Sequence, residues 1–191
     1  MDQLETLIRE SHTLHGHLCP GQILGVRLAA LGCRLVGIDN PQGSRNLLVW
    51  VEIDRCATDA IQSVTGCKLG KRTLKFVDYG KVAATFLNTE TSVAFRVVPR
   101  DDSRQVAHWY APDAPDKKSA QLQAYKVMPD DMLFNVYSVN VTVPDNDLPG
   151  HPLTRVTCQI CDEGINDGRE VTSDGSVVCR ACAGEAYYKS K

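Results

Sequence analysis

A chain of 191 residues has room for one ordinary domain, or for one domain and a small appendage. Hydrophobic residues make up 43% and charged residues 23% of it, as is typical of a globular protein with a buried core. The formal charge of −2 excludes a general electrostatic attraction to nucleic acid or to an anionic membrane surface.

Neither a membrane span nor a signal peptide is visible in the sequence. No stretch approaches the ~20 apolar residues that cross a bilayer, and the first dozen residues lack an apolar segment. We therefore expect a cytoplasmic protein that makes no membrane contact. In a reducing compartment, the eight cysteines are better interpreted as metal ligands and buried thiols than as four disulfides.

Two helices are expected first. Apolar residues recur at helical spacing from about residue 2 to residue 14. A second helix follows Pro20, with leucines at positions 24, 28, 31 and 35, and Gly37 can end it. Cys33 lies off that leucine row, so we interpret it as a small helical residue and not as a ligand.

The loop between these helices, His15-Gly16-His17-Leu18-Cys19-Pro20-Gly21, carries the first chemical motif. In an extended loop, alternate side chains point the same way, so His15, His17 and Cys19 can converge on one ion such as zinc. The alternative is an ordinary loop with two solvated histidines and a half-buried cysteine.

A run of strands is expected after residue 46. Apolar alternation predicts a strand over 46–54, and a short helical stretch over 55–62 is closed by Gly66. The further elements are strands at 73–79, 82–89 and 92–99, a loop within 100–118, a helix at 119–128, and a strand or extended arm at 133–143. The short links between the three strands favour antiparallel pairing. Helices followed by strands predict an α+β class, with helices packed on an antiparallel sheet.

Residues 144–154 contain three prolines and a glycine, which is typical of a linker. We therefore expect a core domain at 1–143, a linker at 144–154 and a small domain at 155–191.

The small domain contains the strongest motif. Cys158 and Cys161 form one C-x2-C pair, and Cys179 and Cys182 form another after seventeen residues. This spacing indicates a structural zinc site with four cysteine ligands. A hairpin is expected between the pairs, and a short helix at 183–188 after the second pair resembles a treble clef. A segment of ~35 residues cannot bury a sufficient core, so we expect metal binding to be coupled to its folding.

Six acidic and five basic residues lie between 155 and 191, and a zinc–tetrathiolate unit adds about −2 more. Such a module is poorly suited to phosphate contacts. Nucleic-acid binding is not favoured, and a protein–protein contact, such as closure over a dimer partner, is the better interpretation.

A second metal site is hypothesised in the core. His17 and Cys19 would be two ligands and Cys56 the third, with His15 or Cys67 completing or lining the site. Three ligands plus water would leave an open position able to polarise a bound group. Asp59 lies one helical turn beyond Cys56. It could hydrogen-bond to a metal ligand or accept a proton. The alternative is an ordinary acidic residue in the first turn of a helix.

An anion-binding rim is a further hypothesis, to be weighed against an ordinary solvated face. Its members would be Lys68, Lys71, Arg72 and Lys75.

The chain resembles the FmdE-like family, named after the FmdE component of tungsten or molybdenum formylmethanofuran dehydrogenase. Five segments carry the resemblance, the last of them like the auxiliary zinc finger of many members: 15–21 with Leu24-Gly25, Cys56-Ala57-Thr58-Asp59-Ala60-Ile61-Gln62, Thr65-Gly66-Cys67-Lys68-Leu69-Gly70-Lys71, Asp78-Tyr79-Gly80-Lys81, and the tail 158–188.

The resemblance implies an α+β core, often dimeric, with an appended treble-clef finger. It also implies an association with one-carbon metabolism that uses a molybdenum or tungsten pterin enzyme. It does not imply that this chain holds the pterin or performs the oxidation.

Three functions follow as hypotheses. The first is a homodimeric metal-binding accessory subunit or partner of such an oxidoreductase, with an open core site for a small unidentified ligand and a second transition metal, zinc by preference. The second is a non-enzymatic interaction or regulatory protein that recruits a partner through the finger. The third is a carrier of metal or sulfur. No residue is assigned a catalytic role, and whether the chain is an enzyme is left open.

Overall fold

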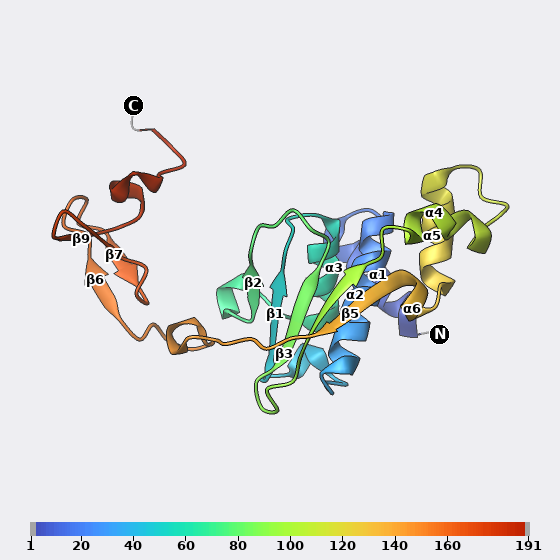
Figure 1. The fold of residues 1–191 in the computed structure, drawn as a ribbon, viewed down its shortest axis with the longest axis horizontal. Helices are drawn as coiled ribbons and strands as arrows, with labels where there is room; N and C mark the ends of the chain where they lie inside the picture. The colour runs from blue at the N-terminus through green and yellow to red at the C-terminus, as the bar shows by residue number, and fades with distance from the viewer. Residues whose placement is uncertain (1–2, 190–191) are drawn as a thin grey trace. The chain divides into compact units, whose positions relative to one another are not determined.

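A computed structural model describes residues 3–189 of the chain (Figure 1). The described residues up to Val141 form one compact unit, and those from Thr142 onwards form a second. The first unit packs helices on a mixed sheet, and the second is a small finger. The α+β class predicted from the sequence is confirmed.

The helices of the first unit are α1 (Gln3–His15), α2 (Pro20–Leu35), α3 (Cys56–Thr65), α4 (Ser103–Tyr110), α5 (Lys117–Val127) and α6 (Asp130–Leu133). Its strands are β1 (Leu47–Val51), β2 (Leu74–Phe76), β3 (Ala84–Asn88), β4 (Ala94–Pro99) and β5 (Phe134–Ser138). The predicted helices at 2–14 and after Pro20 are confirmed, and the helical stretch that begins at 55 is confirmed and continues to Thr65. Gly66 ends it with a φ of 68°.

The sheet has the strand order β2-β1-β3-β4-β5. The expected antiparallel pairing holds for β1 with β3, β3 with β4, and β4 with β5. It is wrong for β2, which pairs parallel with β1. The reason is that α3 lies between these strands, and a helical crossover returns the chain in its original direction.

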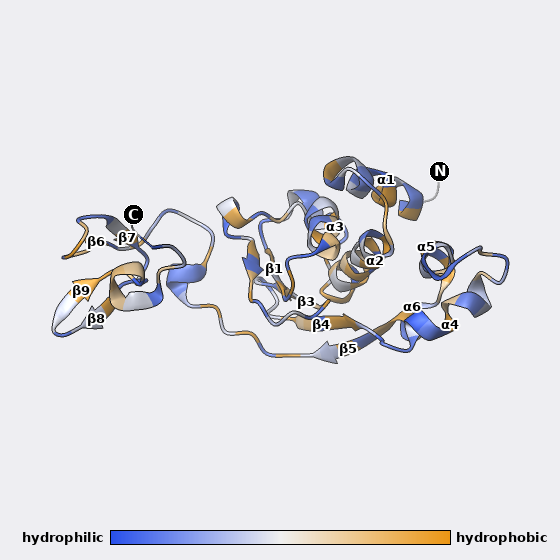
Figure 2. Ribbon diagram, turned by 90° about the horizontal axis from the view of Figure 1, so that it is seen from above, coloured by the Kyte–Doolittle hydropathy of each residue, from blue (hydrophilic) through white to orange (hydrophobic). Residues whose placement is uncertain are grey.

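Helix α2 is the centre of the core, and Figure 2 shows its predominantly apolar colouring. Two of its glycines allow close contacts. A Cβ on Gly25 would lie 2.5 Å from the Ala57 carbonyl oxygen, and one on Gly32 would overlap the Phe86 ring. The backbone of α2 therefore touches α3 on one side and reaches the sheet on another.

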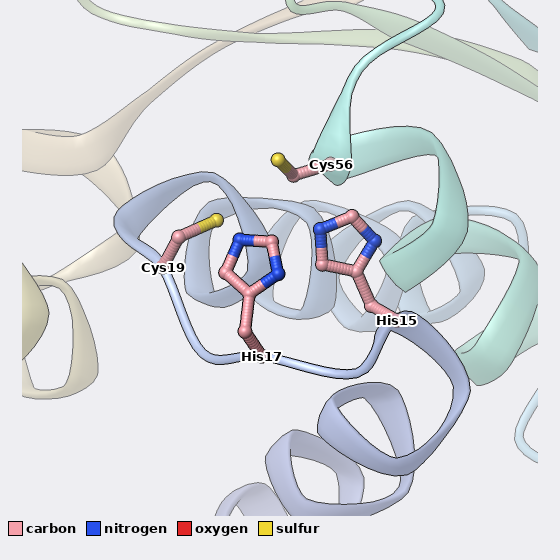
Figure 3. A group of neighbouring side chains, drawn as sticks. All are labelled: His15, His17, Cys19 and Cys56. Carbon is pink, nitrogen blue, oxygen red and sulfur yellow. The ribbon is translucent and has the colours of Figure 1, made fainter.

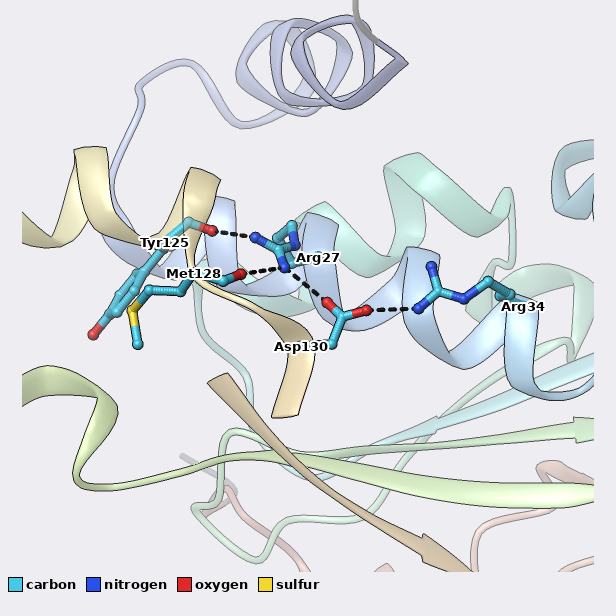
Figure 4. A network of polar contacts seen from close by, with 5 residues as sticks. All are labelled: Arg27, Arg34, Tyr125, Met128 and Asp130. Atoms are coloured by element: carbon cyan, nitrogen blue, oxygen red, sulfur yellow. Dashed lines mark hydrogen bonds and ion pairs between the residues drawn. The ribbon is translucent and has the colours of Figure 1, made fainter. Parts of the chain in front are cut away.

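Two helices of this unit did not follow from the sequence. Helix α4 lies within the predicted loop at 100–118, and α6 is a single turn between α5 and β5. The guanidinium of Arg27, on α2, holds the end of α5 and the start of α6 in place (Figure 4). Arg27 donates hydrogen bonds to the carbonyl oxygens of Tyr125 and Met128, each at 2.8 Å, and to Asp130 at 2.7 Å.

Arg34, two turns further along α2, binds the other carboxylate oxygen of Asp130 at 2.6 Å. The pair of arginines thus fixes the end of α5 and the start of α6 to α2.

The second unit contains two small antiparallel hairpins and one short helical turn. Its strands are β6 (Arg155–Thr157), β7 (Gly164–Asn166), β8 (Val171–Ser173) and β9 (Ser176–Val178), and the turn spans Ala181–Glu185. Cys158, Ile165 and Val178 form its only buried hydrophobic cluster among the described residues. So small a core leaves most of the folding free energy to other contacts.

Within residues 3–189, none of the helices combines the length and the apolar character that a bilayer crossing requires.

Candidate metal centres

The histidine loop is shaped by the end of α1. The Gly16 N–H donates to the His12 carbonyl oxygen at 2.8 Å, and Gly16 adopts a φ of +87°. This left-handed turn is open to glycine at no steric cost, and it directs the chain away from the helix axis. Cys19 then caps α2 with extended backbone angles, and Pro20 begins the helix.

Four donor atoms meet where this loop approaches the start of α3. One ligand atom from each of His15, His17, Cys19 and Cys56 lies within 4.8 Å of the other three. Figure 3 shows the four side chains pointing toward one another: His15 from the end of α1, His17 and Cys19 from the loop, and Cys56 from the first turn of α3. Two imidazoles and two thiols form a donor set that suits zinc or another borderline-soft transition metal.

His15 is held by a carboxylate. Its Nδ1 lies 2.7 Å from Oδ2 of Asp59, and its side chain is only 15% exposed. The other ring nitrogen, Nε2, is buried and has no hydrogen-bond partner. A buried polar atom without a partner is costly, and a metal ion would remove that cost. A carboxylate on one nitrogen and a metal on the other is a recurrent arrangement for histidine ligands.

Gln22 joins the backbones of the two cysteines. Its N–H donates to the Cys19 carbonyl oxygen at 3.0 Å, and its side-chain Nε2 donates to the Cys56 carbonyl oxygen at 2.5 Å. Ser11 of α1 donates in turn to Oε1 of Gln22, and both side chains are fully buried. Sequence reasoning missed this connection. The available signal was a glutamine within an apolar helical pattern.

The two thiols are neighbours at the N-termini of α2 and α3. Burial, and then a hydrogen bond with Cys19, raise the pKa of the Cys56 thiol. A Cβ on Gly21 would lie 3.3 Å from Cβ of Cys56 and 3.7 Å from Sγ of Cys19. The glycine therefore leaves space for the thiol pair. Both helix dipoles favour negative charge at this point, which suits thiolate ligands.

Cys67 is not part of this group, contrary to one of the sequence-based options. It is buried, and its Sγ lies 3.8 Å from the Leu47 carbonyl oxygen at the start of β1. The reason is that Cys56 begins α3 and Cys67 follows its end, and ten helical residues span about 15 Å.

Cys33 is also buried, in the core as expected, beside α2's other apolar residues. The basic residues proposed as an anion rim do not line the core group. Lys68, Lys71 and Arg72 precede β2, whereas Cys56 follows β1, and the two strands are parallel. These residues therefore lie at the opposite end of the strands from Cys56.

The finger holds a second group of donors. Ligand atoms of Cys158, Cys161, Cys179 and Cys182 lie within 4.8 Å of one another. Backbone N–H groups, those of Cys161 and Cys179 first, lower the pKa of the Cys158 thiol to about 6. Contact with Cys179 raises the pKa of Cys182 to about 12.

Four crowded sulfur atoms, one stabilised as a thiolate by N–H groups, fit a closed tetrahedral zinc site.

Two protein families match separate parts of the chain. The family described as "FmdE, Molybdenum formylmethanofuran dehydrogenase operon" matches residues 14–142. The family "Prokaryotic dksA/traR C4-type zinc finger" matches residues 152–188. Together with the four-cysteine group, the second match indicates a zinc site in the finger.

One solved structure and one further protein are similar to this chain. A solved structure of a tungsten formylmethanofuran dehydrogenase FmdE-like protein from Syntrophus aciditrophicus has a TM-score of 0.65 and 19% identity, over 97% of this chain and 95% of the other. A "Probable S-adenosyl-L-methionine-binding protein" of Archaeoglobus fulgidus is 33% identical over 98 residues. That match covers 50% of this chain and 27% of the relative, so the chain spans about a quarter of that relative's length.

Proposed function

Because the chain belongs to the FmdE family, we propose that it is a metal-binding accessory subunit or partner of a molybdenum- or tungsten-dependent one-carbon oxidoreductase of the formylmethanofuran dehydrogenase type. The core ion would be held by donors from His15, His17, Cys19 and Cys56. The observation that carries the proposal is the buried Nε2 of His15, which has no partner and belongs to a set of convergent nitrogen and sulfur donors.

The protein's own residues prepare this site in three ways. Asp59 orients His15, Gln22 fixes the backbones of both cysteines, and the N-termini of α2 and α3 favour their thiolate forms. A bound transition metal would supply a Lewis acid able to polarise a small ligand or to acidify water. This arrangement supports binding or activation of a small ligand.

Partnership with the oxidoreductase, and assembly as a homodimer, belong to the same proposal. The description of the matched family names a dehydrogenase operon, and the similar solved structure carries the name of one component of such a dehydrogenase. The finger, with its fully exposed Tyr187 and its acidic balance, is the region we propose for the protein contact.

Metal analysis of the purified chain tests the core site. We expect about two ions per chain, one of which is lost in Cys19→Ala. Cys33→Ala is the matched control, because it removes a buried thiol of the same domain outside the group, and it should keep both ions. A single ion that persists in Cys19→Ala would eliminate the core site.

The alternative is a non-enzymatic interaction or regulatory protein whose finger recruits a partner. Four thiolates leave no open position on the finger ion, and Ile160 and Tyr187 are exposed on this unit at 64% and 98%. Deleting residues 151–191 should then abolish capture of oxidoreductase subunits, while hydrogen exchange of the core is unchanged. Undiminished capture by the truncated chain would rule out this role.

A further inference from the structure

We infer that the two histidines of the core group have different tasks: His15 is a permanent ligand positioned by Asp59, whereas His17 is a replaceable ligand. Departure of His17 would give the ion a coordination position for a small exogenous nitrogen or sulfur donor. This inference rests on the proposed metal site and adds how that site opens.

Three of the four donors are anchored by contacts that do not involve a metal. His15 is fixed through Nδ1 by Asp59 at 2.7 Å. The carbonyl groups of Cys19 and Cys56 both accept hydrogen bonds from Gln22, at 3.0 Å and 2.5 Å. All three side chains are half-buried. Their positions are therefore set by α1, α2 and α3 before any ion binds.

His17 has no such anchor. Within residues 3–189, neither of its ring nitrogens makes a hydrogen bond or an ion pair, and its one ring–ring contact is with His15, at 4.5 Å between centroids. The residue is exposed, unlike the other three. It also follows Gly16, whose φ of +87° is available at low cost to glycine, and it lies in a bend without regular structure.

The number of protein ligands decides whether the ion has an open coordination position. Four protein ligands complete a tetrahedron, as in a structural zinc site, and three ligands leave an open position. Withdrawal of the one unanchored ligand converts the first state into the second without disturbing α2 or α3. Any replacement must be small, and it must offer nitrogen or sulfur to suit a borderline-soft ion.

The test uses the full chain with zinc in the finger and Co²⁺ in the core, and imidazole as the probe. Cobalt affinity is measured by competition with a chromophoric chelator, and the d–d absorption bands report the ligand set. The variants are His15→Ala, His17→Ala, Asp59→Ala and Asp59→Asn. His12→Ala is the matched control, because His12 lies on the same helix and outside the group.

We expect Asp59→Ala to weaken cobalt binding ~10–100-fold, as is usual when the carboxylate behind a histidine ligand is removed. Asp59→Asn should recover part of that loss, since its amide oxygen still accepts from Nδ1. His17→Ala should keep its cobalt with a smaller loss of affinity than His15→Ala, and its bands should shift with imidazole until saturation. The wild type should show the same shift at higher imidazole concentration, and His15→Ala should not. His12→Ala should match the wild type.

Equal losses in His15→Ala and His17→Ala, or equal rescue of both by imidazole, would overturn the inference while leaving the metal site intact. So would an affinity of Asp59→Ala within twofold of wild type; this variant keeps the inference testable if His15→Ala does not fold. Failure of the metal site itself has another signature, because wild-type and Cys19→Ala chains would then bind the same amount of cobalt.

Discussion

The two donor groups are built in opposite ways. The four cysteines of the finger come from two short pairs, and only a cluster of Cys158, Ile165 and Val178 lies buried around them. The core group takes three donors from the end of α1 and the loop after it, and the fourth from a helix that begins 37 residues beyond Cys19. It rests on a continuous hydrophobic core. We therefore expect the finger to need its ion in order to fold, and the core to fold first and then offer its donors to an ion.

The difference separates structural from chemical use of a metal. Where the ion replaces a hydrophobic core, exchanging its ligands would unfold the domain. Where helix packing already fixes the donors, a ligand can leave at little cost to stability.

Removal of both ions by a strong chelator should unfold the finger and spare the core. A structural zinc site contributes ~10–16 kcal/mol of apparent binding free energy, more than a finger of this size can replace. Hydrogen exchange followed by mass spectrometry should show complete loss of protection in peptides from 155–189 and retained protection in α2 and β3. Equal loss in both regions would show that the core also depends on metal.

Gly25→Val should damage the core and leave the finger unchanged. The added side chain meets the Ala57 carbonyl oxygen and the Ala60 side chain, whose atoms lie 2.5 Å and 2.7 Å from the position of a Cβ. Overpacking at this contact should cost about 3 kcal/mol in the free energy of unfolding, measured by urea titration.

Because α2 and α3 each carry one thiol of the core group, cobalt affinity of Gly25→Val should fall as well. Gly70→Ala is the control, since nothing lies within 4 Å of its Cβ position. Wild-type cobalt affinity in a destabilised Gly25→Val chain would show that helix packing does not set the site.

Asp130→Asn should destabilise the core by about 1–2 kcal/mol at pH 7, because it removes the charge that Arg27 and Arg34 share. Burial raises the pKa of Asp130, but hydrogen bonds from both arginines outweigh it, and the pKa lies below its ordinary value of 3.8. The carboxylate therefore stabilises the fold above that value, and the contribution is lost as the pH falls through the folded-state pKa.

Urea titrations at pH 7, 5 and 3 should show the difference between wild type and Asp130→Asn shrinking below about pH 4. Asp101→Asn, at an exposed position elsewhere in the same unit, should show little difference at any pH. A difference that is as large at pH 3 as at pH 7 would assign the effect to the hydrogen-bond acceptor that the amide lacks and not to the charge of Asp130.

Cys67→Ala should have the smallest effect. The thiol is buried, with its Sγ 3.8 Å from the Leu47 carbonyl oxygen, so its removal should cost at most about 1 kcal/mol and leave both ions in place. Loss of an ion in this variant, measured by elemental analysis, would show that Cys67 is a ligand of the core ion.

Local patterns were sufficient to predict much of this molecule. The four finger cysteines meet because each pair is joined by a tight turn, so their spacing alone places them together. The helices at both sides of the histidine loop follow from the spacing of apolar residues, and Cys56 was included because it starts a helix. In each case the relevant contacts lie within a few residues or one helical turn.

What could not be predicted depends on orientation between elements. Whether His15 or Cys67 joins the core group is decided by the direction and length of α3, and the sequence does not reveal on which side a crossover helix returns. The parallel pairing of β2 has the same origin. The side chain of Gln22, in the first turn of α2, reaches the Cys56 carbonyl oxygen at the start of α3. A glutamine within an apolar helical pattern indicates a buried amide but does not identify its partner.

The contact at Gly25 has a consequence for how such a protein can change over time. Since main-chain atoms of α2 and α3 touch there, the gap between the two sulfurs depends on bare backbone and hardly at all on the bulk of surrounding side chains. Neutral substitutions can therefore change much of the hydrophobic interior while the spacing of the thiols is kept, so long as Gly25 and the contacts of Gly21 and Gln22 at the two cysteines are retained.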